Sequence, residues 1–143
     1  MVKCVGVIIY DISKNMFLLQ QRSRTSTYAL KWGLWGGKLE ENENFTDALK
    51  RELLEEISVN VDIKDIKPLD MFVSADGSFV YSSFVLVTDK LENLKISEIE
   101  TNDYVWLPLE SILKIDLHPA TKNVISDKYH ILEKVVKDYN IPT

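Results

Sequence analysis

Cysteine is almost absent from this chain of 143 residues, since Cys4 is the single one. One cysteine excludes an intramolecular disulfide and is typical of a reducing compartment, and we expect Cys4 to pack within a buried strand. Long apolar runs are also missing. None approaches the ~20 residues of a membrane span, and Asp11 interrupts the apolar start before a signal sequence is complete. These absences predict a soluble, cytoplasmic protein with no membrane partner.

Basic charge is in the minority, because 17 lysines and arginines face 22 aspartates and glutamates, for a net charge of −5. The basic residues are scattered and form no stripe, which argues against duplex nucleic acid and other long polyanions as partners. A small anion that arrives with a cation remains compatible with this charge. The length and the 45% hydrophobic content predict one domain that covers residues 1–143.

Two pairs of strands are predicted from short runs rich in β-branched and aromatic residues between turn signals. The cluster DISKN separates the first pair, and Asp76-Gly77 is a hairpin signal within the second. A charged, irregular loop then leads into a further short strand. The predicted strands cover residues 2–10, 16–22, 66–74, 79–87 and 104–109.

Two main helices are predicted. Asn44 can cap the first, with Asp47 three residues later, and we expect this helix to end near Ser58. A stop at His118-Pro119 precedes an amphipathic pattern over residues 120–139, which predicts the second helix. The apolar stripe of the first helix consists of Phe45, Leu49, Leu53 and Ile57. A mixed sheet with two main helices is an α/β or α+β sandwich.

The first helix carries an unfavourable cluster of acids, Glu52, Glu55 and Glu56, in its C-terminal half. Like charges three and four residues apart repel one another, and the negative end of the helix dipole adds to the cost. Converging carboxylates favour a hard divalent cation, Mg²⁺ or Mn²⁺, which takes oxygen ligands. The alternative is a solvated acidic helix face.

Residues beside these acids suit the same chemistry. Arg51 adjoins Glu52, and its guanidinium can orient a glutamate or hold a phosphate. Gly36 and Gly37 precede the helix, where residues without Cβ let the backbone bend sharply and approach a metal or phosphates.

The stretch from Gly37 to Val59 resembles the Nudix box, whose pattern is Gly, five residues, Glu, seven residues, Arg-Glu-aliphatic-any-Glu-Glu-any-Gly-aliphatic. Ser58 stands where the family has glycine, and Trp35 stands where many members have the proline of Pro-Gly-Gly. The remaining specified positions match at Gly37, Glu43, Arg51, Glu52, Leu53, Glu55, Glu56 and Val59.

The resemblance implies an α-β-α sandwich with a mixed central sheet and two main helices. It also implies a hydrolase that uses Mg²⁺ or Mn²⁺ to cleave a diphosphate linkage in a nucleoside diphosphate derivative. The implied metal ligands are Glu52, Glu55, Glu56 and Gly37. The catalytic candidates are Glu52, Arg51 and Glu100, and the structural residues of the box are Glu43 and Gly36.

Glu100 lies in the charged loop before the strand at 104–109. In MutT-like members of the family, a glutamate in a comparable loop adds a metal ligand or base. Glu98 competes with Glu100 for this role, and an ordinary surface acid is the alternative for both.

Five residues outside the box are candidates for substrate binding. Arg22 and Arg24 end the second strand and could contact phosphate, with plain surface placement as the alternative. Trp32 and Trp35 could stack on a base, although large aromatics more often pack a core. His118 could contact the nucleotide, and a capping or surface role is the alternative.

The leading hypothesis is a MutT-like nucleoside triphosphate pyrophosphohydrolase, a Nudix hydrolase that acts on a small-molecule nucleotide. The alternatives are an ADP-ribose or nucleotide-sugar pyrophosphatase, with GDP-mannose as one example, and a nucleotide-sensing module without catalysis. The intact glutamates of the box argue against a pure sensor. The base, the sugar and the oligomeric state stay open, with a homodimer among the alternatives.

Overall fold

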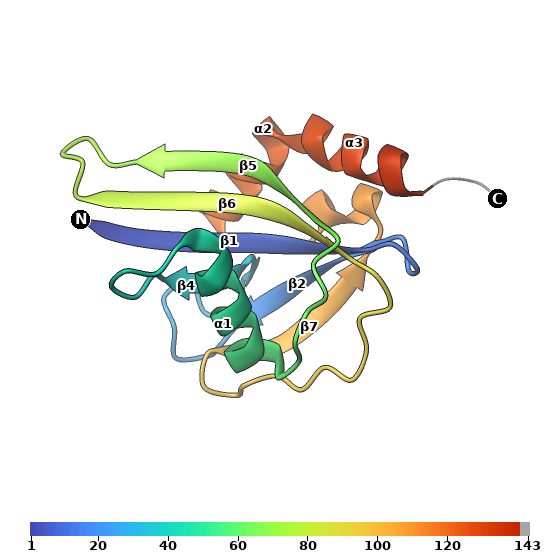
Figure 1. Cartoon of the computed structure of the whole chain (residues 1–143), viewed down its shortest axis with the longest axis horizontal. Helices are drawn as coiled ribbons and strands as arrows, with labels where there is room; N and C mark the ends of the chain where they lie inside the picture. The colour runs from blue at the N-terminus through green and yellow to red at the C-terminus, as the bar shows by residue number, and fades with distance from the viewer. Residues whose placement is uncertain (141–143) are drawn as a thin grey trace.

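The computed structural model describes residues 1–140 of the chain. Helices and strands alternate irregularly along it (Figure 1). The elements are β1 (Val2–Asp11), β2 (Met16–Arg22), β3 (Trp32–Gly33), β4 (Trp35–Lys38), α1 (Phe45–Ile57), β5 (Asp65–Val73), β6 (Phe79–Thr88), β7 (Thr101–Leu107), the 3₁₀ helix η1 (Leu109–Lys114), α2 (Pro119–Asp127) and α3 (Tyr129–Tyr139). No helix within residues 1–140 is long and apolar enough to cross a membrane.

The strands form one mixed sheet with the order β3-β2-β1-β6-β5. β1 pairs in parallel with β6, and its other pairings, with β2 and β4, are antiparallel. β7 pairs antiparallel with β2 and begins at Thr101, opposite Arg22, which is three residues earlier than the sequence predicts. This early start brings the residue before it, Glu100, to the edge of the sheet.

Helices cover both faces of the sheet, with α1 on one side and α2 and α3 on the other (Figure 1). Alternation along β1 supplies both cores: Val5, Val7 and Ile9 pack toward α1, while Ile8 and Tyr10 pack toward α2 and α3. The predicted α-β-α sandwich with a mixed sheet is therefore confirmed.

The predicted tail helix is divided in two. His118 and Pro119 begin α2 instead of only stopping the preceding segment, because the His118 side chain accepts a hydrogen bond from the Ala120 amide. The chain then turns at Lys128, whose ψ of 19° departs from helical geometry. The turn lets Ile125 of α2 and Leu132 of α3 bury against the same core. Periodicity continued through this bend, so the pattern alone predicted one helix.

Candidate active site

Helix α1 sets the directions of the acids. Asn44 caps it by accepting a hydrogen bond from the Asp47 amide at 2.8 Å, as predicted. Glu52 and Glu56 lie on the buried side of the helix, with exposed fractions of 7% and 2%. The Glu55 side chain is 59% exposed. Glu52 and Glu56 are therefore buried at the junction between α1 and the sheet, whereas Glu55 stays at the surface.

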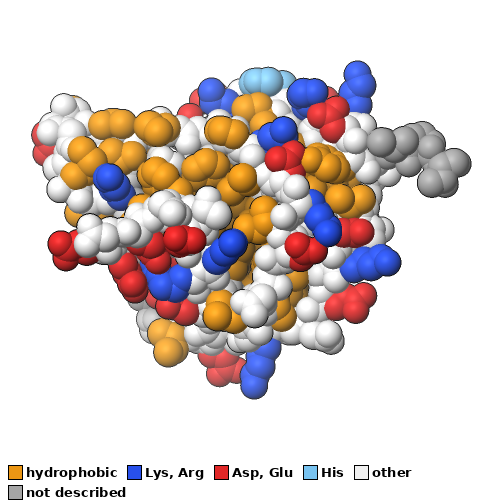
Figure 2. All heavy atoms as spheres, viewed as in Figure 1, with side chains coloured by type: hydrophobic (Ala, Val, Ile, Leu, Met, Phe, Trp, Pro, Cys, Tyr) orange, Lys and Arg blue, Asp and Glu red, His pale blue; other side chains and the backbone are white. Residues whose placement is uncertain are grey.

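Arg51 holds the loop before α1 against the helix. Its Nε and Nη2 donate to the two oxygens of Glu43 at 2.8 and 2.9 Å, and Nη2 also donates to the Lys38 carbonyl. Its Nη1 donates to Glu52 at 3.1 Å and to Glu55 at 3.5 Å. Figure 2 shows acidic side chains gathered over this loop. Arg51 therefore orients glutamates, and its hydrogen bonds bring the pKa of Glu43 down to about 2.

Glu56 has one satisfied oxygen and one without a partner. Its Oε1 accepts a hydrogen bond from the Gly36 amide at 2.9 Å, whereas its buried Oε2 has no hydrogen-bond partner among the described residues. Burial raises the pKa of Glu56 to about 8, and the carboxylates of Glu52 and Glu100 add to the increase. The Gly36 amide and the Gln20 side chain oppose it. A buried oxygen without a partner is expected to bind a cation or to accept a hydrogen bond.

The two glycines bring β4 close to these carboxylates. Gly36 has a φ of +134°, and a Cβ there would lie 2.0 Å from the Val5 carbonyl oxygen. A Cβ at Gly37 would lie 2.5 Å from Glu52 Oε1. Burial also raises the pKa of Glu52, with Arg51 opposing the increase. Gly36 therefore requires glycine for its backbone, whereas a larger residue at Gly37 would displace the Glu52 carboxylate.

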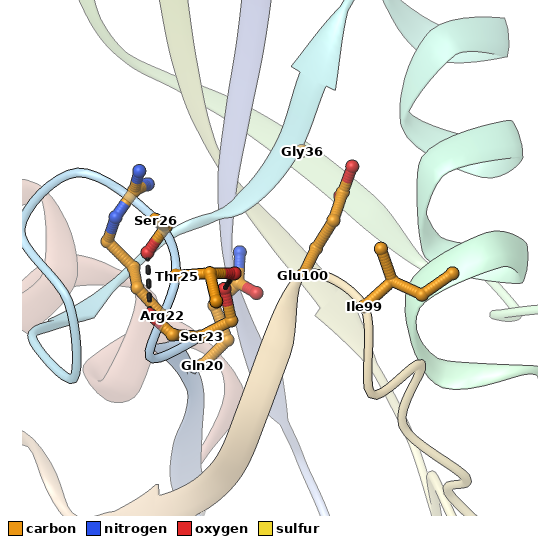
Figure 3. A pocket seen from close by; sticks show the side chains of 8 residues that line it. All are labelled: Gln20, Arg22, Ser23, Thr25, Ser26, Gly36, Ile99 and Glu100. Carbon is orange, nitrogen blue, oxygen red and sulfur yellow. Dashed lines mark hydrogen bonds between the residues drawn. The ribbon is translucent and has the colours of Figure 1, made fainter.

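An open cleft of about 390 Å³ lies beside this group (Figure 3). Glu100 and Ile99 border it from the segment that leads into β7, and Arg22 borders it from the end of β2. The Arg22 side chain donates to the carbonyl and the hydroxyl of Thr27, which ties it to the loop after β2. The remaining lining residues are Gln20, Ser23, Thr25, Ser26 and Gly36.

Comparison with known proteins decides the family, because the NUDIX domain model matches residues 2–128. The chain belongs to the Nudix family. It is 31% identical to nucleoside triphosphatase NudI of Escherichia fergusonii over 109 residues, which cover 68% of this chain and 76% of that protein. For NudI of Enterobacter sp. strain 638 the identity is 27% over 120 residues, or 78% and 85% of the two chains.

The solved structures agree. The crystal structure of a MutT protein from Methanosarcina mazei Go1 is 26% identical, covers 92% of this chain and 95% of that one, and superposes with a TM-score of 0.71. This Nudix chain is therefore a hydrolase. Members of the family generally use divalent metals. The family and the NudI relatives support nucleoside diphosphate derivatives as the general class of substrate.

The residues of this Nudix box fit a divalent cation, although they do not form a finished site. Among residues 1–140, no three acidic, histidine or cysteine side chains converge closely enough to hold a metal ion. Arg51 draws Glu52 and Glu55 toward itself, as expected where carboxylates would otherwise repel one another. The unpartnered Oε2 of Glu56 supplies the oxygen chemistry that Mg²⁺ requires, and the lack of a side chain at Gly37 leaves room for the Glu52 carboxylate.

The structure contradicts the expectation that Trp35 could stack on a base. It is fully buried in the core beneath α1, and its indole N–H donates to the Leu18 carbonyl at 3.1 Å. Trp32 is half-buried and packs against the other core, so neither ring borders the cleft. Aromatic residues near a glycine pair are compatible with either role, and the strand in which each residue lies decides between them: Trp35 is in β4 and Trp32 is in β3.

The other candidate residues also differ in whether they line the cleft. Arg22 lines the cleft, whereas Arg24 is exposed and is not among the lining residues. His118 caps α2, its ring lies 4.4 Å from that of Tyr28, and it is not among the residues that line the cleft. Burial lowers the pKa of His118. Both competing loop acids are exposed, and of the two only Glu100 lines the cleft.

Sequence reasoning missed the hydroxyl side of the cleft, which is formed by Ser23, Thr25 and Ser26. The run SRTST directly after β2 contained the available signal, because hydroxyl groups beside an arginine are typical of sites for phosphate or sugar oxygens. Such runs are also common in ordinary surface loops, so the pattern alone was not specific.

Proposed function

We propose that this chain hydrolyses nucleoside triphosphates to a nucleoside monophosphate and pyrophosphate, with Mg²⁺ or Mn²⁺ as cofactor. The observation that carries the proposal is the buried Glu56, whose Oε2 has no hydrogen-bond partner among the described residues and whose Oε1 is held by Gly36, a residue that lines the open cleft together with Glu100. The names of the NudI relatives favour a triphosphate within the broader class of nucleoside diphosphate derivatives.

The acids of α1 have the first role in this proposal. Glu52, Glu55 and Glu56, together with the Gly37 carbonyl, hold the cation, which supplies Lewis-acid charge to the phosphate oxygens when it is bound. Arg51 keeps Glu52 and Glu55 oriented from the side, through the hydrogen bonds described above. The Gly36 amide holds Oε1 of the buried Glu56, which leaves its second oxygen available as a ligand.

The cleft residues have the second role. Arg22 and the hydroxyls of Ser23, Thr25 and Ser26 bind phosphate or sugar oxygens of the nucleotide. Glu100 or Glu52 accepts a proton from the attacking water. The water oxygen bonds to a phosphorus of the α,β-anhydride, the bond from that phosphorus to the bridging oxygen breaks, and the two phosphate products separate.

The test is a release assay with purified protein and Mg²⁺ over the nucleoside triphosphates, ADP-ribose and nucleotide sugars. We expect pyrophosphate from at least one triphosphate, with kcat/KM at least about tenfold above that for ADP-ribose or GDP-mannose. Preference for either of those would support the pyrophosphatase alternative. Binding of a nucleotide without turnover, with the metal supplied, would support a sensing module and overturn the proposal.

A further inference from the structure

A buried polar pair crosses the sheet beneath the cleft. The Gln20 side chain donates from Nε2 to the Leu34 carbonyl at 2.7 Å, and its Oε1 accepts from the Thr101 hydroxyl at 2.7 Å. Thr101 is fully buried and Gln20 is 8% exposed. Because β2 lies between β3 and β7, one glutamine amide joins the link between β3 and β4 on one side to the start of β7 on the other.

Each end of this pair is adjacent to an acid of the site. Leu34 lies two residues before Gly36, whose amide binds Glu56. Thr101 directly follows Glu100, and the Glu100 carbonyl accepts a hydrogen bond from the Ser23 amide at 3.1 Å. The Gln20 and Thr101 side chains, which we call the Gln20–Thr101 clamp, therefore connect the backbone beside Glu56 with the backbone beside Glu100.

A polar clamp is an unexpected choice for this position. The next residues along β2 toward its start, Leu18 and Leu19, are fully buried and apolar, and an apolar pair could fill the same space without polar groups to satisfy. What an amide adds is direction, since its N–H must face a carbonyl and its oxygen must face a donor. The clamp thus fixes how the start of β7 lies relative to the segment before β4.

We propose that Gln20 and Thr101 are positioning residues that hold the Glu100 carboxylate over the cleft at Glu56. This inference rests on the proposed function for its effect on rate, because Glu100 has a chemical role only if the site hydrolyses a phosphoanhydride. Its structural part, the restraint on residues 97–101, is independent of activity. Within that segment the Thr101 amide donates to the Ser97 carbonyl, and the Ser97 amide donates to the Glu56 carbonyl.

The first experiment compares Thr101→Val with Thr88→Val. Thr88 is a matched control, because it is 1% exposed and its hydroxyl donates to the Asp62 carbonyl at 2.8 Å, away from the cleft. Both variants lose one buried hydroxyl hydrogen bond and keep the side-chain shape. We expect similar decreases in Tm, but an about tenfold lower kcat with KM changed less than about twofold only for Thr101→Val. Thr101→Ser restores the donor and should recover most of kcat.

The second experiment asks whether the clamp acts through Glu100. In the Glu100→Gln background, adding Thr101→Val should lower kcat by less than about twofold, because the group being positioned is already lost. A full additional tenfold loss would mean that Thr101 acts by another route. Wild-type kcat in Thr101→Val, or an equal kcat loss in Thr88→Val, would also overturn the clamp.

The third experiment is hydrogen–deuterium exchange of the metal-free variants without substrate. Residues 97–101 should exchange at least about threefold faster in Thr101→Val than in the wild type, and at the wild-type rate in Thr88→Val. Unchanged exchange in Thr101→Val would overturn the clamp even if the wild type hydrolysed no nucleotide. A wild type without any hydrolysis would overturn the proposed function alone, so the two failures are distinguishable.

Discussion

Ser58 closes α1 in a backbone conformation that suits glycine. Its φ of 61° and ψ of 24° lie in the left-handed region, and its amide donates to the Leu54 carbonyl. A Cβ in this region costs about 1–2 kcal/mol, and the Nudix box has glycine at this position. We predict that Ser58→Gly raises the free energy of unfolding by about 1 kcal/mol, measured by urea denaturation, without changing kcat. Ser126→Gly, an exposed change within α2, should instead lower stability. A destabilised Ser58→Gly would contradict the cap.

At Glu56, the charged side chain that we propose for catalysis lowers the stability of the metal-free protein. Its charged form is buried without a cation, so Glu56→Gln removes an unfavourable group from the metal-free protein and keeps an oxygen for the Gly36 amide. We predict a higher Tm in EDTA at pH 8 and a kcat at least about 10²-fold lower with Mg²⁺. Glu55→Gln should lose kcat similarly, whereas Glu133→Gln, on the exposed surface of α3, should change neither quantity. Near-native turnover in both box variants would contradict the metal assignment.

At the scale of elements, the segment before β7 decides which loop acid takes part in the reaction. Glu98 and Glu100 are both exposed, but Glu100 borders the cleft and its charge contributes to the raised pKa of both Glu52 and Glu56, whereas Glu98 does neither. We predict that Glu100→Gln lowers kcat at least about tenfold with little effect on KM, while Glu98→Gln is almost silent in the same steady-state assay. A loss of kcat in Glu98→Gln alone would assign this role to Glu98 instead. Full activity in both would leave the base to an acid of α1.

Elements with local signals were predictable, and those fixed by distant contacts were not. The cap at Asn44, the apolar stripe of α1 and the β5–β6 hairpin each depend on residues close together in the sequence. The bend at Lys128 and the buried Trp35 depend on what the rest of the chain packs against them. The hydrogen bond between Gln20 and Thr101 joins residues 81 positions apart, and neither residue type suggests the other. The glutamates of the site were predictable because the box has fixed spacing.

At the scale of the whole molecule, stability should depend on pH and metal together. The pKa of Glu56 rises from 4.5 to about 8 on folding, so the metal-free folded state holds this proton more tightly than the unfolded state does. The resulting stabilisation is fully present below pH 4.5 and is lost as the pH rises through about 8. The pKa of Asp11 shifts in the opposite direction. Its pKa is lowered by hydrogen bonds from Ser13, Leu91, Lys14 and Lys90 despite its burial, so its contribution is lost only as the pH falls below 3.8.

A divalent cation would reverse the cost of ionised Glu56, because it binds the carboxylate and competes with the proton. We therefore predict that Mg²⁺ raises Tm at pH 8 by at least about 3 °C more than at pH 5.5, compared with EDTA at each pH in thermal denaturation scans. Glu56→Gln should show nearly the same small Mg²⁺ effect at both pH values, since the titrating group is gone. Ca²⁺ and Na⁺ at matched ionic strength control for size selectivity and for general screening of the net charge of −5. An Mg²⁺ effect that is equal at the two pH values in the wild type would mean that the cation binds elsewhere, and Glu56 would then be a buried acid without a metal role.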